Sequence, residues 1–235
     1  MKAPGKLYLI PSILAPGSTN VIPEQTRLVI AGLDYFLVEN ARSARRFISA
    51  LNLGIQIDQL QFELVDKKTS FEESMELLEP IRQGKNGGIL SEAGCPGVAD
   101  PGALTVSSAH QLGIMVVPLS GPSSVLLALM ASGFNGQSFV FHGYLPIDKD
   151  ERKNKIRELE RAALRSGQTQ IFMETPYRNE QIFQTLIQVC NNNTRLCIAS
   201  NITAENETIK TYSIERWKKS RPDIYKIPTI FIIGQ

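Results

Sequence analysis

The residues best suited to chemistry lie in one glycine-rich stretch, residues 91–102, with the sequence SEAGCPGVADPG. Its three glycines allow close approach of a ligand to the backbone and positive φ angles, and its two prolines restrict the chain. Glu92 and Asp100 place one carboxylate toward each end. Because the stretch has no lysine and none of the dinucleotide, P-loop or nucleophile-elbow spacings, it is no phosphate cradle or hydrolase elbow. The acids instead suit a ligand with hydroxyls and a positive charge, such as a sulfonium nucleoside.

The elements around this stretch predict a largely parallel α/β sheet, because strand-like apolar runs alternate with helical patterns. Residues 91–102 follow a predicted strand and precede a predicted helix, so they belong at the carboxyl edge where α/β proteins bind ligands. Ser70 and Glu73 form a capping box that begins one helix. We expect strands at 7–10, 35–38, 61–64, 88–91, 114–118, 139–145, 170–173, 195–200, 208–212 and 229–233. We expect helices at 24–31, 43–51, 71–83, 104–111, 125–131, 150–165 and 179–190.

Two α/β patterns meet near residues 119–121, which predicts two domains, 1–119 and 120–235. Composition is ordinary for a globular enzyme, with 43% hydrophobic residues and a net charge of +2. No apolar run approaches the ~18 residues of a membrane helix, and we interpret residues 7–10 as a first buried strand rather than a leader. Three scattered cysteines and two histidines predict neither disulfides nor a metal centre, and the expected compartment is the cytoplasm.

Residues 91–102 resemble the Ser-Asp-Ala-Gly-Thr-Pro…Ser-Asp-Pro-Gly signature of the tetrapyrrole methylase superfamily. The resemblance continues, in the right order, through residues 118–124, 131–133, 141–146 and 173–178. The most similar branch methylates the 2′-hydroxyl of a cytidine in small-subunit ribosomal RNA. The resemblance implies two α/β domains, S-adenosylmethionine in the cleft between them, and a homodimer. The donor-binding residues it implies are Glu92, Ala93, Gly94, Val98, Asp100, Gly121, Pro122, Ser123, Met173, Glu174, Pro228 and Thr229.

Four segments depart from the family pattern, and all four lie on the side expected to hold the methyl acceptor. Residues 11–15 lack the family's glycine and asparagine, and Glu39-Asn40-Ala41-Arg42 has lost one acid of Glu-Asp-Thr-Arg. Residues 65–68 replace a histidine-containing segment, and residues 199–204 replace Ala-Arg-Glu-Leu-Thr-Lys. The donor side is therefore expected to be kept, whereas the acceptor side is altered.

Methyl transfer from a sulfonium is an in-line displacement in which alignment supplies much of the rate. A ribose hydroxyl is weakly acidic, so a general base would help, and the candidates are Glu39, Glu174 and His142. For Glu174 a structural ion pair with Arg178 competes with a catalytic role. For His142 a satisfied histidine in a strand competes in the same way.

Three functions remain open from the sequence. The first is a methyltransferase for RNA, in which the basic segments 149–165 or 216–221 would face the substrate rather than form solvated helix faces. The second is a methyltransferase for a small molecule such as a tetrapyrrole, which would require a wide apolar trough. The third is a protein that binds the donor without turnover.

Overall fold

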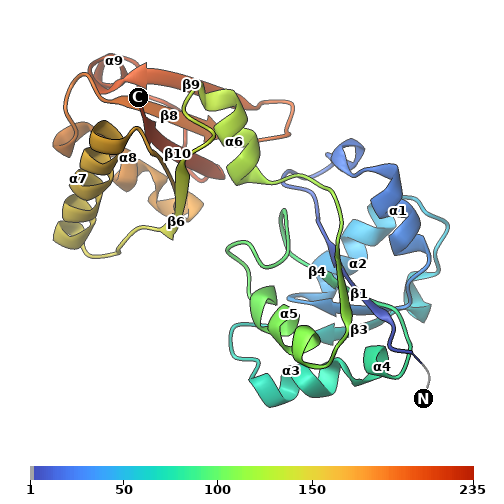
Figure 1. The fold of residues 1–235 in the computed structure, drawn as a ribbon. Helices are drawn as coiled ribbons and strands as arrows, with labels where there is room; N and C mark the ends of the chain where they lie inside the picture. Colours follow the sequence, from blue (N-terminus) through green and yellow to red (C-terminus); the bar gives the residue numbers. More distant parts are fainter. Residues whose placement is uncertain (1–2) are drawn as a thin grey trace. The chain divides into compact units, whose positions relative to one another are not determined.

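A computed structural model describes residues 3–235. The chain divides into two compact units, Met1–Ser123 and Ser124–Gln235 (Figure 1). Each unit contains one five-stranded sheet with helices packed against it. Within residues 3–235, no helix combines the length and the apolar character needed to cross a membrane.

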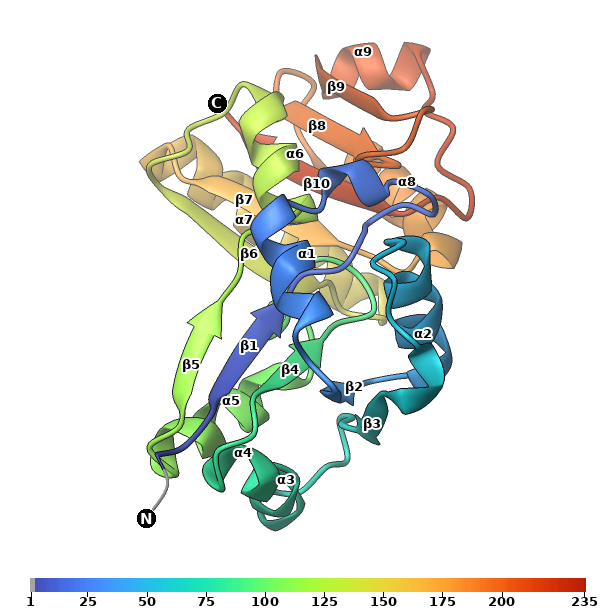
Figure 2. The same ribbon diagram turned by 90° about the vertical axis from the view of Figure 1, so that its right-hand side faces the viewer.

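The first unit is built on a fully parallel sheet whose strand order is β3-β2-β4-β1-β5 (Figure 2). Its central strand β4 is buried along its whole length and begins with two glycines. A Cβ at Gly88 would come within 2.4 Å of Cδ1 of Ile10, so the absence of a side chain lets β1 and β4 pack closely. The strands are β1 Lys6–Ile10, β2 Tyr35–Val38, β3 Gln61–Leu64, β4 Gly87–Leu90 and β5 Met115–Pro118.

Apolar clusters fill the space between this sheet and its helices. The predicted helix at 71–83 is wrong in one respect, because the structure divides it into α3 and α4 at Leu78. Pro80 lies in the first turn of α4, where its missing N–H costs nothing, and it could not continue α3. The capping box of Ser70 and Glu73 begins α3 as expected. The helices are α1 Glu24–Ala31, α2 Ala41–Ala50, α3 Phe71–Leu77, α4 Glu79–Arg82 and α5 Gly102–Gln111, with short 3₁₀ turns η1 Thr19–Val21 and η2 Ile57–Gln59.

The second unit has a mixed sheet, which corrects the expectation of a largely parallel one. The order is β6-β7-β10-β8-β9, and only the β6–β7 pair is parallel. Strand β10 is inserted between β7 and β8 and runs antiparallel to both. The strands are β6 Phe139–Tyr144, β7 Thr169–Met173, β8 Arg195–Ser200, β9 Thr208–Ser213 and β10 Thr229–Gly234.

Four α-helices cover the second sheet. Helices α7 Lys149–Ser166 and α8 Asn179–Val189 pack on the face that presents Phe172 and Phe231, and α6 Ser124–Ser132 contacts β8, β9 and β10 (Figure 1). Helix α9 Ile214–Lys219 was not predicted. It is only six residues long, but Trp217 is buried and donates its indole N–H to the carbonyl of Leu196 at 2.8 Å.

Candidate donor loop and acid cluster

The glycine-rich stretch forms a loop between β4 and α5, and this loop is paired with the segment that follows β1. The amide of Ser12 donates to the carbonyl of Gly94 at 2.9 Å, and the amide of Gly94 donates back at 3.3 Å. Ser91 Oγ also donates to the Gly94 carbonyl at 2.7 Å. Gly94 and Gly97 have φ angles of 74° and 78°, a region that disfavours other residues. These contacts therefore fix the loop in one conformation.

Asp100 closes the second half of this loop. Its Oδ1 accepts hydrogen bonds from the amides of Gly97 at 3.1 Å and Gly102 at 2.8 Å. The residue before it, Ala99, has a positive φ of 60°, which a non-glycine residue adopts only when its surroundings require it. One carboxylate oxygen thus fixes both the turn at Gly97 and the first residue of α5.

Three carboxylates gather at this edge of the first sheet. Glu39 follows β2, and its Oε1 accepts from the amide of Glu92 at 3.4 Å. Ser43, in the first turn of α2, donates to Glu92 Oε1 at 3.2 Å. The pKa of Glu39 is raised to about 7. The largest cause is burial, and a hydrogen bond to Asp100 and the negative charge of Asp100 also raise it. Near neutral pH the Glu39 carboxyl is therefore partly protonated and partly ionised.

Gly121 and Pro122, which were predicted to bind the donor, lie beside this loop and the segment that follows β1. Cys95 Sγ contacts the carbonyl of Pro122 at 3.5 Å. A Cβ at Gly121 would come within 2.4 Å of Cβ of Pro11, so the close approach of these two segments requires glycine. Ser123 ends the first unit. Ala93 and Val98 are exposed on the loop, and Val98 presents half of its surface to solvent.

The altered segment 11–15 contributes a group that the sequence did not single out. The hydroxyl of Ser12 is buried and has no hydrogen-bond partner, although the backbone of Ser12 is fully paired with Gly94. Buried hydroxyls are normally satisfied, so this one is available to a polar ligand at the loop. Carboxylates, positive-φ glycines and an unpaired hydroxyl together suit a cationic group that carries ribose hydroxyls.

In the second unit, the predicted residues also share one edge of a sheet. Met173 ends β7 and pairs with Ile230, directly after Pro228 and Thr229. Thr229 Oγ1 lies 3.0 Å from Ser200 Oγ, and the Pro228 carbonyl accepts from the amide of Asn201 at 3.0 Å. The structure therefore brings together Met173, Glu174, Pro228 and Thr229 with the end of β8.

Glu174 and His142 both have structural partners. The Glu174 side chain is fully buried, with Oε2 2.9 Å from Nη2 of Arg178 as an ion pair rather than a well-aligned hydrogen bond. Its Oε1 accepts from the amide of Thr175 at 2.7 Å. His142 lies within β6, with Nε2 2.8 Å from Oε1 of Gln170 on β7. Glu39 is half-buried and has a pKa raised to about 7, whereas Glu174 is buried in an ion pair and His142 is held by Gln170, so Glu39 is the candidate base best placed for proton transfer.

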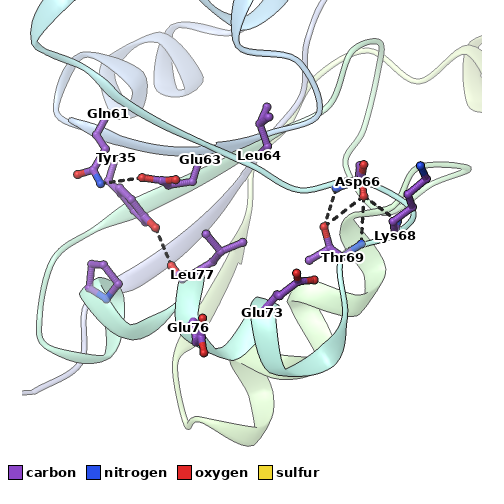
Figure 3. Close-up of a pocket in the computed structure, with 11 residues that line it drawn as sticks. Tyr35, Gln61, Glu63, Leu64, Asp66, Lys68, Thr69, Glu73, Glu76 and Leu77 are labelled. Atoms are coloured by element: carbon purple, nitrogen blue, oxygen red, sulfur yellow. Dashed lines mark hydrogen bonds between the residues drawn. The ribbon is translucent and has the colours of Figure 1, made fainter.

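A 620 Å³ cavity lies elsewhere in the first unit, between the edge strand β3 and helix α3 (Figure 3). Tyr35 donates its hydroxyl to the Leu77 carbonyl at 2.7 Å there, and burial raises its pKa to about 12. Four acids and one lysine line the cavity, which makes it unsuitable for an anionic substrate. None of the predicted site residues borders it. The charged lining residues are Glu63, Asp66, Lys68, Glu73 and Glu76.

Comparison with known proteins gives a consistent result. A family model described as tetrapyrrole (corrin/porphyrin) methylases matches residues 8–217. The ribosomal RNA small subunit methyltransferase I of Vibrio cholerae is 30% identical over 204 residues, which cover 87% of this chain and 67% of that protein.

Two solved structures share the fold at 17% identity. The methyltransferase CobJ has a TM-score of 0.64, with 98% of this chain and 94% of that chain covered. The uroporphyrin-III C-methyltransferase from Thermus thermophilus, solved with S-adenosyl homocysteine, has a TM-score of 0.59 with 98% of both chains covered.

Proposed function

The chain belongs to the tetrapyrrole methylase family and is a methyltransferase that uses S-adenosylmethionine, and on this premise we propose that it methylates a ribose 2′-hydroxyl in small-subunit ribosomal RNA. The similarity to the ribosomal RNA methyltransferase of Vibrio cholerae, over 87% of the chain, carries this proposal. The likeness to tetrapyrrole enzymes is weaker in sequence and extends to the fold alone. A small-molecule acceptor is therefore the less favoured alternative.

The donor is proposed to contact the loop between β4 and α5. S-adenosylmethionine supplies a methyl group already activated on a sulfonium. Glu92 gives this side of the site negative charge, Asp100 fixes the loop through two backbone amides, Gly94 allows the backbone to approach, and the unpaired hydroxyl of Ser12 offers a hydrogen bond. Ala93, Val98 and Ala99 are the exposed apolar groups of the loop. For Gly121, Pro122, Ser123, Met173, Glu174, Pro228 and Thr229, contact with the donor stays a prediction.

Glu39 is proposed as the general base. The acceptor hydroxyl must lose its proton as its oxygen attacks the methyl carbon, and a carboxylate with a pKa of about 7 accepts a proton more readily than one of ordinary acidity. The neighbouring Asp100 carboxylate maintains this basicity, because two adjacent carboxylates resist being charged together. A homodimer in the cytoplasm is part of the same proposal, and light scattering of the purified protein tests the dimer.

The decisive experiment supplies labelled S-adenosylmethionine with small ribosomal subunits from a bacterium that lacks 2′-O-methylation of its small-subunit RNA. We expect label in a 2′-O-methylated nucleoside after nuclease digestion, and greatly reduced label with Glu39→Gln. Label in no RNA fraction, with transfer to a tetrapyrrole instead, would overturn the choice of acceptor. A protein that binds the donor but transfers no label to either acceptor would indicate a non-catalytic role.

A further inference from the structure

Three exposed tyrosines gather at one edge of the second sheet. Tyr144 ends β6, Tyr177 lies in the 3₁₀ turn η3 Pro176–Arg178 after β7, and Tyr225 lies in the loop before β10. Their exposed fractions are 53%, 72% and 56%. The second unit contains four tyrosines, so three of them present their rings to solvent at this edge. Aromatic rings exposed together in this way commonly mark a binding surface.

Lys226 connects two of these rings. Its Nζ lies 5.5 Å from the centroid of the Tyr177 ring and 5.0 Å from that of Tyr225. The amide of Lys226 donates to the carbonyl of Pro176 at 3.2 Å, which joins the loop before β10 to the turn after β7. Lys226 also has a φ of 58°, a conformation that a lysine adopts only where its surroundings impose it.

The backbone beneath the tyrosines is anchored, although their side chains are exposed. Asn179 is fully buried, and its Nδ2 donates to the carbonyls of Ile227 at 2.6 Å and Ile224 at 3.4 Å. Arg178 joins Glu174 to the loop after β6 through the carbonyl of Pro146 at 3.4 Å. A surface fixed in this way loses little conformational entropy when it binds a partner.

The charge of this unit favours an anionic partner. Residues 124–235 contain 15 Lys and Arg against 11 Asp and Glu, a net charge of +4, whereas residues 1–123 have a net charge of −2. Lys226 lies within the tyrosine group itself, and the exposed Arg221 precedes Tyr225 in the same loop. Exposed aromatic rings with interspersed cations are the usual recognition surface for unpaired nucleotides, whose bases stack and whose phosphates are charged.

We propose that Tyr144, Tyr177 and Tyr225 form a stacking platform for unpaired bases of single-stranded RNA, with Lys226 and Arg221 contacting its phosphates. This inference deepens the proposed function and rests on it, because it states how the RNA substrate is held. It also specifies the substrate class as an unpaired segment, since bases within a duplex present no free face to stack.

The test measures the affinity of the purified protein for a fluorescein-labelled RNA oligonucleotide without internal base pairing, and for the corresponding duplex. The double variant Tyr177→Ala/Tyr225→Ala should weaken single-strand binding at least about tenfold. The matched variant Tyr177→Phe/Tyr225→Phe keeps the rings and should stay within about twofold of the wild type. Lys226→Met keeps the packing and should lower the salt dependence by about one phosphate contact.

Calorimetric titration with S-adenosylmethionine shows whether each variant is folded, because its donor affinity should be unchanged. A folded alanine variant that binds single-stranded RNA as well as the wild type would overturn the platform, and so would a preference for the duplex. The outcomes also distinguish a failure of the proposed function from a failure of the stacking platform. If the tyrosines determine oligonucleotide binding but no ribosomal RNA is methylated, the platform stands and the acceptor is another RNA. If ribosomal RNA is methylated with an unchanged KM in the alanine variant, only the platform fails.

Discussion

Substitution of Asp100 tests whether this carboxylate holds the donor loop or contacts the donor through its charge. Oδ1 of Asp100 accepts from the amides of Gly97 and Gly102. In Asp100→Ala, the exposed amide of Gly97 regains water, but the amide of Gly102 is buried and is left without a partner. Hydrogen bonds to charged groups contribute about 1.5–3 kcal/mol each, so we expect a loss of about 2 kcal/mol in the stability of the closed loop.

The same loss appears in donor affinity if the donor binds only the ordered loop and the loop of the unbound variant is mostly disordered. A cost of about 2 kcal/mol corresponds to about 30-fold weaker binding, because each 1.4 kcal/mol is tenfold. Calorimetric titration of the wild type, Asp100→Ala and Asp100→Asn with S-adenosylmethionine measures it. The asparagine keeps an oxygen acceptor for both amides, so its affinity should fall no more than about threefold.

The asparagine variant provides the refutation. If Asp100→Asn binds the donor as weakly as Asp100→Ala and both remain folded, the charge of Asp100 acts on the donor and the loop argument is wrong. A second readout separates the two roles of this residue. Both variants remove the charge beside Glu39, so both should lower the pKa of Glu39 and move the acid limb of the kcat profile to lower pH.

Three other predictions follow from contacts in the two units. The pKa of Glu39 is raised from 4.5 to about 7 in the folded state, so its stabilising contribution is present below pH 4.5 and is lost as the pH rises to about 7. Glu39→Gln should therefore make the free energy of unfolding, measured by urea titration, depend less on pH, and an unchanged pH dependence would contradict this. Arg178→Ala leaves the buried Glu174 carboxylate unpaired and should destabilise the second unit by about 3–5 kcal/mol, with partial recovery when Glu174→Gln is added. Trp217→Phe removes the hydrogen bond to Leu196 and should cost about 1–2 kcal/mol in denaturant unfolding, whereas an unaffected variant would show that this hydrogen bond contributes little to stability.

The strands β2 and β4 of the first sheet were predictable because both are buried along their whole length and therefore appear as short runs of apolar residues and glycine. The expected strand at 88–91 differs from β4 Gly87–Leu90 by one residue at each end. The helix that begins after Ser70 was also predictable, since a capping box is a local signal that tertiary contacts rarely override.

The acid cluster could not be predicted in the same way. Glu39 and Asp100 are far apart in the sequence, and each was singled out for a different role. They meet because β2 and β4 are neighbours in the order β3-β2-β4-β1-β5, so their carboxyl ends open at the same edge. Strand order is a property of long-range packing, and the apolar pattern of each strand does not encode it. The raised pKa of Glu39 depends in part on its contact with Asp100, so it could not be predicted from the sequence either.

The directions of the strands in the second unit could be predicted only in part from the sequence. Only a short segment, residues 201–207, separates β8 from β9, and a parallel pair would need a crossover of about a dozen residues. That pair could have been predicted as antiparallel. The direction of strand β10 could not be predicted, since a strand buried along its whole length shows the same apolar run in either direction.

The antiparallel direction of β10 has a direct consequence, because it brings the start of β10 to the edge where β7 and β8 end, with Ile230 beside Met173 and Thr229 beside Ser200. In a parallel sheet the loop that carries Tyr225 and Lys226 would lie at the opposite edge from Tyr177. The stacking platform therefore exists only because β10 is antiparallel.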